Sequence, residues 1–351
     1  MTQSEIFAAR LKNARIMKGF SQDDLVSAMG IEISKMSISK YENNKMSPSS
    51  SVIISLANAL NQPIDYFFRP FTLQIESIKF RKKSRLSVNP EKMIKEKILD
   101  LIERYIDIEE ICNVSKIFSS PLKDKISNSN QVKKAASELR KSWNIGVDGI
   151  VNVIDLLEEQ GIRILEIDAP EFFDGLSSMV NDIYPVIVLN KSLSSERKRF
   201  TALHELGHII LSFESDIAEK EEEKLCHIFA SEMLILEPVF VKLIGSSRHD
   251  ISYQELRAIQ LQYGISCDAL MYKAKECGII SQQRYIYYCI KKNKNQNFKQ
   301  IVEKSLYYDE ESNRFTRLVY NALSNELISI SKAANLLHQS VEQVRGDLVL
   351  V

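Results

Sequence analysis

The stretch RFTALHELGHIIL, residues 199–211, is predicted to form a helix that carries a metal site. His204 and His208 are four residues apart, so both imidazoles lie on one helical face and can bind one ion. Glu205 lies one step around, beside that ion. In an H-E-x-x-H pattern a zinc ion holds a water molecule whose proton the glutamate accepts, which favours peptide hydrolysis. The alternative is a helix with two surface histidines that flank an acid.

A third metal ligand is expected from the following helix, EKEEEKLCHIFASEMLIL, residues 219–236. A catalytic zinc ion takes three protein ligands and keeps a fourth position for water. Glu223 is the predicted ligand, because Cys226 and Phe229, at helical spacing from it, continue its inward face. Four other residues of this helix remain alternative ligands: Glu219, Glu222, Cys226 and His227.

These two segments, RFTALHELGHIIL and ExxCHxFASEMLI, resemble the ImmA/IrrE family of zinc metallopeptidases. The resemblance implies that His204, His208 and Glu223 are the zinc ligands and that Glu205 is the general base. It also implies a substrate, because members of the family inactivate helix-turn-helix repressors in phage, mobile-element and stress responses. One departure is visible: the proline that commonly ends the second motif helix is displaced to Pro238.

Two β-strands are predicted upstream of the metal motif, in GIRILEID (residues 161–168) and YPVIVLN (residues 184–190). The segment PVIVLN is expected beside the catalytic helix. Its edge could pair with an extended substrate backbone, or the strand could simply cover the core. Tyr184 and His249 are candidates for stabilising an oxyanion, and neither is favoured.

Residues 8–68 resemble an XRE/Cro-type helix-turn-helix domain, with a turn at Gly30. A recognition helix after that turn is expected to read the major groove, and Gln22 at the start of the preceding helix suits a phosphate contact. The residues expected to face the groove are Lys35, Met36, Ser37, Ser39 and Lys40. The predicted partner is a double-stranded DNA operator, whose paired half-sites are consistent with a homodimer. The alternative is a small helical protein-interaction domain.

The charge distribution supports two distinct regions. The 46 basic and 46 acidic residues cancel over the whole chain, which excludes a uniformly basic coat protein. Residues 1–90, however, hold 13 basic and 7 acidic residues, including a basic cluster from Lys79 to Arg85. No apolar run approaches the ~18–20 residues that span a bilayer. Five cysteines without a CxxC pair, and the lack of a signal core, predict a cytoplasmic protein without a membrane partner.

The predicted fold is mainly α with a small β-sheet (α+β). Four regions are expected: a helix-turn-helix domain over 1–70, a basic linker and long helix over 71–130, a zinc peptidase core over 131–240, and a helical module over 241–351 with a packing or substrate-docking role. Helices are expected near 252–262, 266–276, 281–292, 313–325 and 330–350.

The predicted function is a DNA-binding transcriptional regulator with a zinc endopeptidase domain. Its substrate would be a repressor, an antitoxin or its own linker. The alternative is a DNA-binding regulator whose metal domain only senses or stabilises, and a third hypothesis is an antitoxin-like partner protein.

Overall fold

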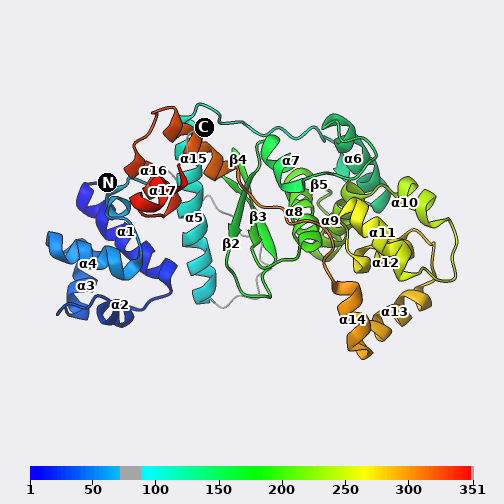
Figure 1. Ribbon diagram of the computed structural model, residues 1–351, viewed down its shortest axis with the longest axis horizontal. Helices are drawn as coiled ribbons and strands as arrows, with labels where there is room; N and C mark the ends of the chain where they lie inside the picture. The colour runs from blue at the N-terminus through cyan, green and yellow to red at the C-terminus, as the bar shows by residue number, and fades with distance from the viewer. Residues whose placement is uncertain (72–87, 349–351) are drawn as a thin grey trace. The chain divides into compact units, whose positions relative to one another are not determined.

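The computed structural model describes residues 1–71 and 88–348, which are mainly helical with small sheets, as predicted (Figure 1). The predicted basic cluster from Lys79 to Arg85 lies outside the described residues. Contacts divide the chain into two compact units. The first unit comprises Met1–Lys116 and Asn313–Val351, and the second comprises Ile117–Ser312. The helical region expected over 241–351 is therefore divided between the two units.

The first unit begins with the predicted helix-turn-helix arrangement. Its elements are α1 (Gln3–Lys18), α2 (Gln22–Ala28), α3 (Lys35–Glu42), α4 (Ser50–Leu60) and the 3-10 helix η1 (Ile64–Phe68). Thr2 and Ser21 begin α1 and α2 with capping boxes, which satisfy backbone N–H groups that a helix start leaves unpaired. Gly30 has a φ of +64° in the turn before α3, a conformation that glycine adopts without steric cost. Ile38 and Tyr41 are buried in the core of this domain.

Four more helices complete the first unit: α5 (Val88–Ile111), α15 (Arg314–Ser324), α16 (Ile330–Leu337) and α17 (Val341–Asp347). Helix α5 packs against α1 and α15. Ion pairs between buried side chains accompany this packing: Arg10 of α1 pairs with Glu103 of α5 at 2.7 Å, and Arg104 pairs with Asp100 within α5 at 3.0 Å.

The single helix expected over 330–350 is wrong, because α16 and α17 are separate helices. His338 ends α16 with a left-handed φ of 54°, and its backbone N–H donates to the carbonyl of Ala334. Ser340 then begins α17 with a capping box. His338 adopts a left-handed conformation that is usual for glycine or asparagine at the end of a helix. Because neither of these residues stands there, nothing in the sequence indicated that the helix ends at this position.

The second unit contains a three-stranded sheet in the order β2-β4-β3. Strand β2 (Arg163–Ile167) is parallel to β4 (Tyr184–Asn190), and β3 (Gly175–Val180) is antiparallel to β4. The two predicted strands are confirmed, but the hypothesis that PVIVLN offers an edge to a substrate is wrong. This segment lies in the central strand, and its backbone is paired on both sides. Strand β3, which pairs with the other side of β4, was not predicted.

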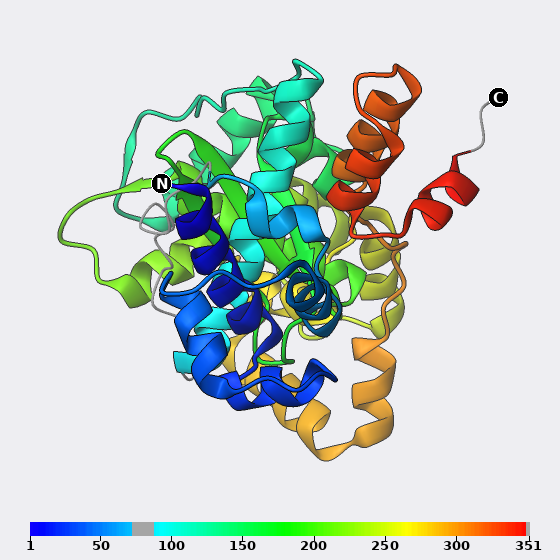
Figure 2. The same cartoon turned by 90° about the vertical axis from the view of Figure 1, so that its left-hand side faces the viewer.

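The rest of the second unit is mainly helical. Its helices are α6 (Ser129–Ser142), α7 (Val153–Glu159), α8 (Ser195–Ile210), α9 (Glu219–Leu234), α10 (Glu237–Ile244), α11 (Tyr253–Tyr263), α12 (Cys267–Glu276), α13 (Gln282–Lys294) and α14 (Gln296–Glu303). A second, parallel strand pair joins β1 (Lys125–Ile126) to β5 (Ser212–Phe213). Helix α8 packs against β3 and β4 and also against α9, whereas α13 and α14 lie side by side in both views (Figure 1, Figure 2). The helices expected near 252–262, 266–276 and 281–292 are confirmed.

Across the described ranges 1–71 and 88–348, every helix is too short or too polar to span a bilayer. All five cysteines are thiols outside any disulfide.

Candidate metal centre

Three side chains from α8 and α9 converge on one point in the second unit. The Nε2 atoms of His204 and His208 are 3.2 Å apart. The two carboxylate oxygens of Glu223 lie 3.3 Å from the Nε2 of His204 and 3.1 Å from that of His208. Within the described residues, this is the group of histidine, cysteine and acidic side chains that could hold a metal ion. The structure thus brings together the three predicted ligands.

The spacing of these donors fits a tetrahedral metal ion. Ligand atoms about 2.0–2.1 Å from a zinc ion, at tetrahedral angles, are separated from one another by about 3.3 Å. The two histidine Nε2 atoms, 3.2 Å apart, match that value, and the two carboxylate oxygens of Glu223 each approach one of these atoms to 3.1–3.3 Å. The Nδ1 atom of His204 is buried without a hydrogen-bond partner among the described residues. The polar contacts of this ring with His208 and Glu223 are therefore made through Nε2. Two histidines and one glutamate form a donor set that is typical of catalytic zinc.

Two of the four alternative ligands, Cys226 and His227, are neighbours of the cluster rather than members of it. The Sγ atom of Cys226 lies 3.4 Å from Nδ1 of His208, where it contacts the far side of that ring. The Nδ1 atom of His227 lies 2.6 Å from the backbone carbonyl oxygen of Glu223, and its ring is 4.3 Å from the ring of His204. Contacts of this kind orient ligating side chains in metal sites.

Gly207 permits the close approach of α9 to α8. A Cβ atom at this position would lie 3.2 Å from the ring of Phe229 and 3.3 Å from the sulfur of Cys226. Both distances are tighter than ordinary van der Waals contact. The absence of a side chain therefore allows Glu223 to reach the two histidines.

Glu205 has a partner that sequence reasoning missed. The hydroxyl of Ser177, on β3, donates a hydrogen bond of 2.7 Å to Oε2 of Glu205. Ser177 is buried and Glu205 is half-buried. The bond holds one carboxylate oxygen and leaves the other for a second partner. No signal in the sequence pointed to Ser177, because β3 itself was not predicted.

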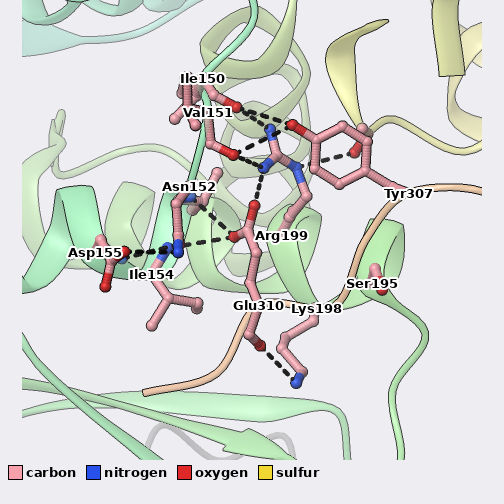
Figure 3. A network of polar contacts seen from close by, with 12 residues as sticks. Ile150, Val151, Asn152, Ile154, Asp155, Ser195, Lys198, Arg199, Tyr307 and Glu310 are labelled. Carbon is pink, nitrogen blue, oxygen red and sulfur yellow. Dashed lines mark hydrogen bonds and ion pairs between the residues drawn. The ribbon is translucent and has the colours of Figure 1, made fainter. Parts of the chain in front are cut away.

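Buried charges anchor the first turns of α8 (Figure 3). The guanidinium of Arg199 pairs with the carboxylate of Glu310, and both side chains are completely buried. Arg199 also donates to the backbone carbonyls of Ile150 and Gly264. The Nζ atom of Lys198 donates to the carbonyl of Glu310. Residues 305–312 therefore fix α8 about one and a half turns before His204.

Glu196 adds a further contact between α8 and the same segment. Its carboxylate accepts hydrogen bonds from the Ser305 hydroxyl at 2.6 Å and from the Leu306 backbone N–H at 2.8 Å. Burial raises the pKa of Glu196, but these hydrogen bonds outweigh that effect and hold the pKa below its usual value. The carboxylate therefore remains charged and bound to the segment.

The predicted DNA contacts lie on or near α3 in the first unit. Lys35, Met36 and Lys40 are exposed, whereas Ser37 and Ser39 are half-buried. Lys35 pairs with Asp23 of α2 at 2.6 Å, and both side chains are well exposed. The side-chain amide of Gln22 donates a hydrogen bond to Glu42 at 2.9 Å, so it already has a partner within the domain.

The two candidates for stabilising an oxyanion lie in the second unit. Tyr184 packs under the guanidinium of Arg163, and His249 is exposed.

Comparisons with known proteins confirm both predicted resemblances. Residues 8–69 match a family model described as a helix-turn-helix domain, and residues 157–275 match one described as an IrrE N-terminal-like domain. A 71-residue stretch is 34% identical to the radiation response metalloprotease IrrE of Deinococcus radiodurans. This stretch covers 17% of the present chain and 22% of the relative, so the chain spans about a fifth of that protein's length. The chain thus combines a helix-turn-helix domain with a metallopeptidase-like domain.

Proposed function

We propose that this protein is a DNA-binding transcriptional regulator with a zinc-dependent endopeptidase in its second unit. The peptidase hydrolyses a peptide bond in a regulatory protein of the repressor or antitoxin class, in a phage, mobile-element or stress response. The observation that carries the proposal is the convergence of His204, His208 and Glu223, with Glu205 beside them. The family matches support the same reaction class.

The reaction assigns a role to each residue of the centre. His204, His208 and Glu223 would hold the zinc ion, which when bound polarises the substrate carbonyl and acidifies a water molecule. Glu205 accepts the proton from the attacking water and transfers it to the leaving amine nitrogen. Ser177 holds Oε2 of Glu205, so the remaining oxygen presents its lone pair to the water. Glu205 is thus a base with a fixed orientation.

The second candidate is a regulator whose metal domain senses or stabilises without proteolysis. A purely structural zinc site needs no base and closes its fourth position with a protein ligand. Here three residues form the cluster, and Glu205 is oriented beside it. These two features favour the enzyme.

The DNA-binding part of the proposal concerns the first unit. The exposed face of α3 is the surface that enters the major groove of a double-stranded operator, and a homodimer reads paired half-sites. The proposed site of action is the cytoplasm, where a regulator has access to both DNA and its protein substrate.

A Glu205→Gln variant tests the enzyme against the sensor. The variant should retain one zinc ion per chain and DNA binding, but it should no longer cleave its substrate. That substrate should accumulate in cells that express the variant and disappear in cells that express the wild type. Quantitative proteomics of the two strains identifies that protein. Glu221→Gln, a matched change at an exposed glutamate of α9, should behave as wild type. If both cleavage and the regulatory output survive Glu205→Gln, the peptidase proposal is wrong and the sensor stands.

A further inference from the structure

A groove in the second unit adjoins the candidate metal centre. Its volume is about 880 Å³, and it is lined by residues of α8, α9 and the helices α11 to α14. Glu223, one of the three clustered donors, forms part of its wall, and so does His227. We call this cavity the α9 groove. Because it shares a donor residue with the centre, a polypeptide bound at the metal can extend directly into it.

Part of the α9 groove is apolar, although most of its lining residues are polar or charged. Six apolar or aromatic side chains line it: Phe200, Ile228, Ala269, Tyr272, Tyr285 and Val302. Tyr272 and Tyr285 form an edge-to-face pair with ring centroids 5.8 Å apart, a geometry that aromatic pairs prefer. This pair gives one wall a fixed aromatic surface.

Charged side chains also line the groove, but most are already paired within the protein. The ion pair of Lys273 and Glu232 is buried. Other pairs involve groove residues and partners around the rim: Lys133 with Glu237, Arg197 with Asp174, Lys224 with Glu221, and Asp268 with Lys292. A phosphate or carboxylate ligand would therefore have to break existing ion pairs. An apolar side chain would not, so the apolar part of the groove favours uncharged groups.

The length of the groove fits several residues of a polypeptide. On α9 its lining runs from Lys220 to Glu232, twelve helical steps, which corresponds to about 18 Å at the helical rise. An extended chain advances about 3.3 Å per residue, so about five residues span this length. The volume likewise exceeds that of any one side chain and matches binding sites for multi-group ligands.

We infer that the α9 groove binds the substrate residues on one side of the scissile bond and selects bulky apolar or aromatic side chains there. This inference rests on the proposed peptidase function and extends it to the substrate class. The occupant is a segment of the protein substrate, because the groove begins at a residue of the metal cluster.

The test uses a proteome-derived peptide library and the zinc-loaded full-length protein, with cleavage sites identified by mass spectrometry. Wild type should cleave peptides enriched in Phe, Tyr, Leu, Ile or Met within about five positions on one side of the cut. Ala269→Trp fills the groove and should shift the preference toward small residues, with at least a tenfold loss of kcat/KM for peptides with bulky residues. Tyr285→Ala should weaken the preference for aromatic residues about fivefold, since it removes one ring of the pair.

Tyr287→Ala is the matched control, because Tyr287 lies on the same helix, α13, but is 57% exposed and outside the groove lining. It should cleave with the wild-type profile. Circular dichroism and zinc content establish that each variant is folded. If Ala269→Trp does not fold, the comparison of Tyr285→Ala with Tyr287→Ala carries the test.

A binding arm separates failure of the groove from failure of the proposed function. Zinc-loaded Glu205→Gln captures peptides from the same library without cleaving them, and the captured set should show the same apolar enrichment, reduced by Tyr285→Ala. Capture of such peptides without any cleavage by wild type would overturn the peptidase function but support the groove. Cleavage without apolar preference, or a preference that both groove variants leave unchanged, would overturn the groove alone. Neither cleavage nor capture would overturn both.

Discussion

The two helices that carry the candidate functional residues, α3 and α8, lie in opposite kinds of environment. Helix α8 is buried against the sheet and α9, and its histidines converge with Glu223 to within 3.3 Å. Helix α3 buries only Ile38 and Tyr41, and presents Lys35 and Lys40 to solvent. Metal chemistry requires donors fixed at short separations, whereas DNA recognition requires exposed side chains that can reach a groove.

This difference explains why buried charge accompanies α8. A helix whose functional side chains must hold fixed positions needs rigid contacts with the rest of the fold. The buried ion pair of Arg199 with Glu310 is one such contact of α8. In the first unit, the buried pair of Arg10 and Glu103 instead joins α1 to α5, away from the exposed face of α3. Helix α3 is held by the apolar packing of Ile38 and Tyr41 and, at its last residue, by the pair of Glu42 with Arg15 of α1 at 2.6 Å.

The largest effect is expected from breaking the support of α8. Glu310→Ala leaves the guanidinium of Arg199 buried without its carboxylate, and loss of one partner of a buried pair costs about 3–5 kcal/mol. The single tryptophan, Trp143, lies in the second unit, so its fluorescence during urea unfolding reports on that unit. Glu311→Ala, at the adjacent exposed residue, should change the free energy of unfolding little. A loss below about 1 kcal/mol in Glu310→Ala would contradict the supporting role.

A smaller effect, of pH, is expected in the first unit. Burial and the nearby Arg104 guanidinium lower the pKa of His338 to about 4. The unfolded chain, with a histidine pKa of about 6.5, binds the proton more readily. The first unit should therefore lose stability as the pH falls from about 6.5 to 4, by up to about 3 kcal/mol, and recover it as the pH rises.

His338→Asn should flatten this pH dependence, because asparagine does not titrate and tolerates the left-handed φ of 54°. The measurement is urea unfolding by circular dichroism between pH 4 and 7, with the Trp143 transition used to identify the second unit. His249→Asn, at an exposed histidine of the second unit, is the control. An unchanged pH dependence in His338→Asn would show that other groups are responsible.

The sequence predicted the metal cluster better than its surroundings. The helical period alone places His204 and His208 on one face, and the inward face of the next helix selects Glu223 among several acids. Ser177 could not be found in this way, because β3 pairs with β4 through tertiary contact and GLSSMV lacks a strong strand pattern. Nor could Glu310, which meets Arg199 across 111 residues of chain.

In the first unit, too, the sequence predicted local structure but not contacts between helices. The sequence located the turn at Gly30, the helix that begins at Gln22 and the recognition helix after the turn, since these depend on neighbouring residues. The engagement of Gln22 by Glu42 depends on how α2 packs against α3, which a local pattern does not encode. The sequence could therefore identify the exposed residues of α3 as a group, but it could not rank them by their expected contribution to DNA binding.

The structure now ranks two of them, and the resulting prediction has the smallest expected effect. Lys35 already pairs with Asp23, whereas Lys40 is exposed on the same helix, so Lys40→Ala should weaken DNA binding more than Lys35→Ala. If Lys40 contacts a phosphate, its loss should lower the slope of log affinity against log salt concentration by about 1. Fluorescence anisotropy with a selected operator duplex measures this slope, and Lys294→Ala, an exposed lysine of the second unit, is the control. Asp23→Asn should strengthen binding slightly, since an exposed ion pair contributes only about 0–1 kcal/mol and its removal frees the Lys35 charge for DNA. Equal losses in the two lysine variants, with no gain in Asp23→Asn, would show that the Lys35–Asp23 pair does not govern how α3 meets DNA.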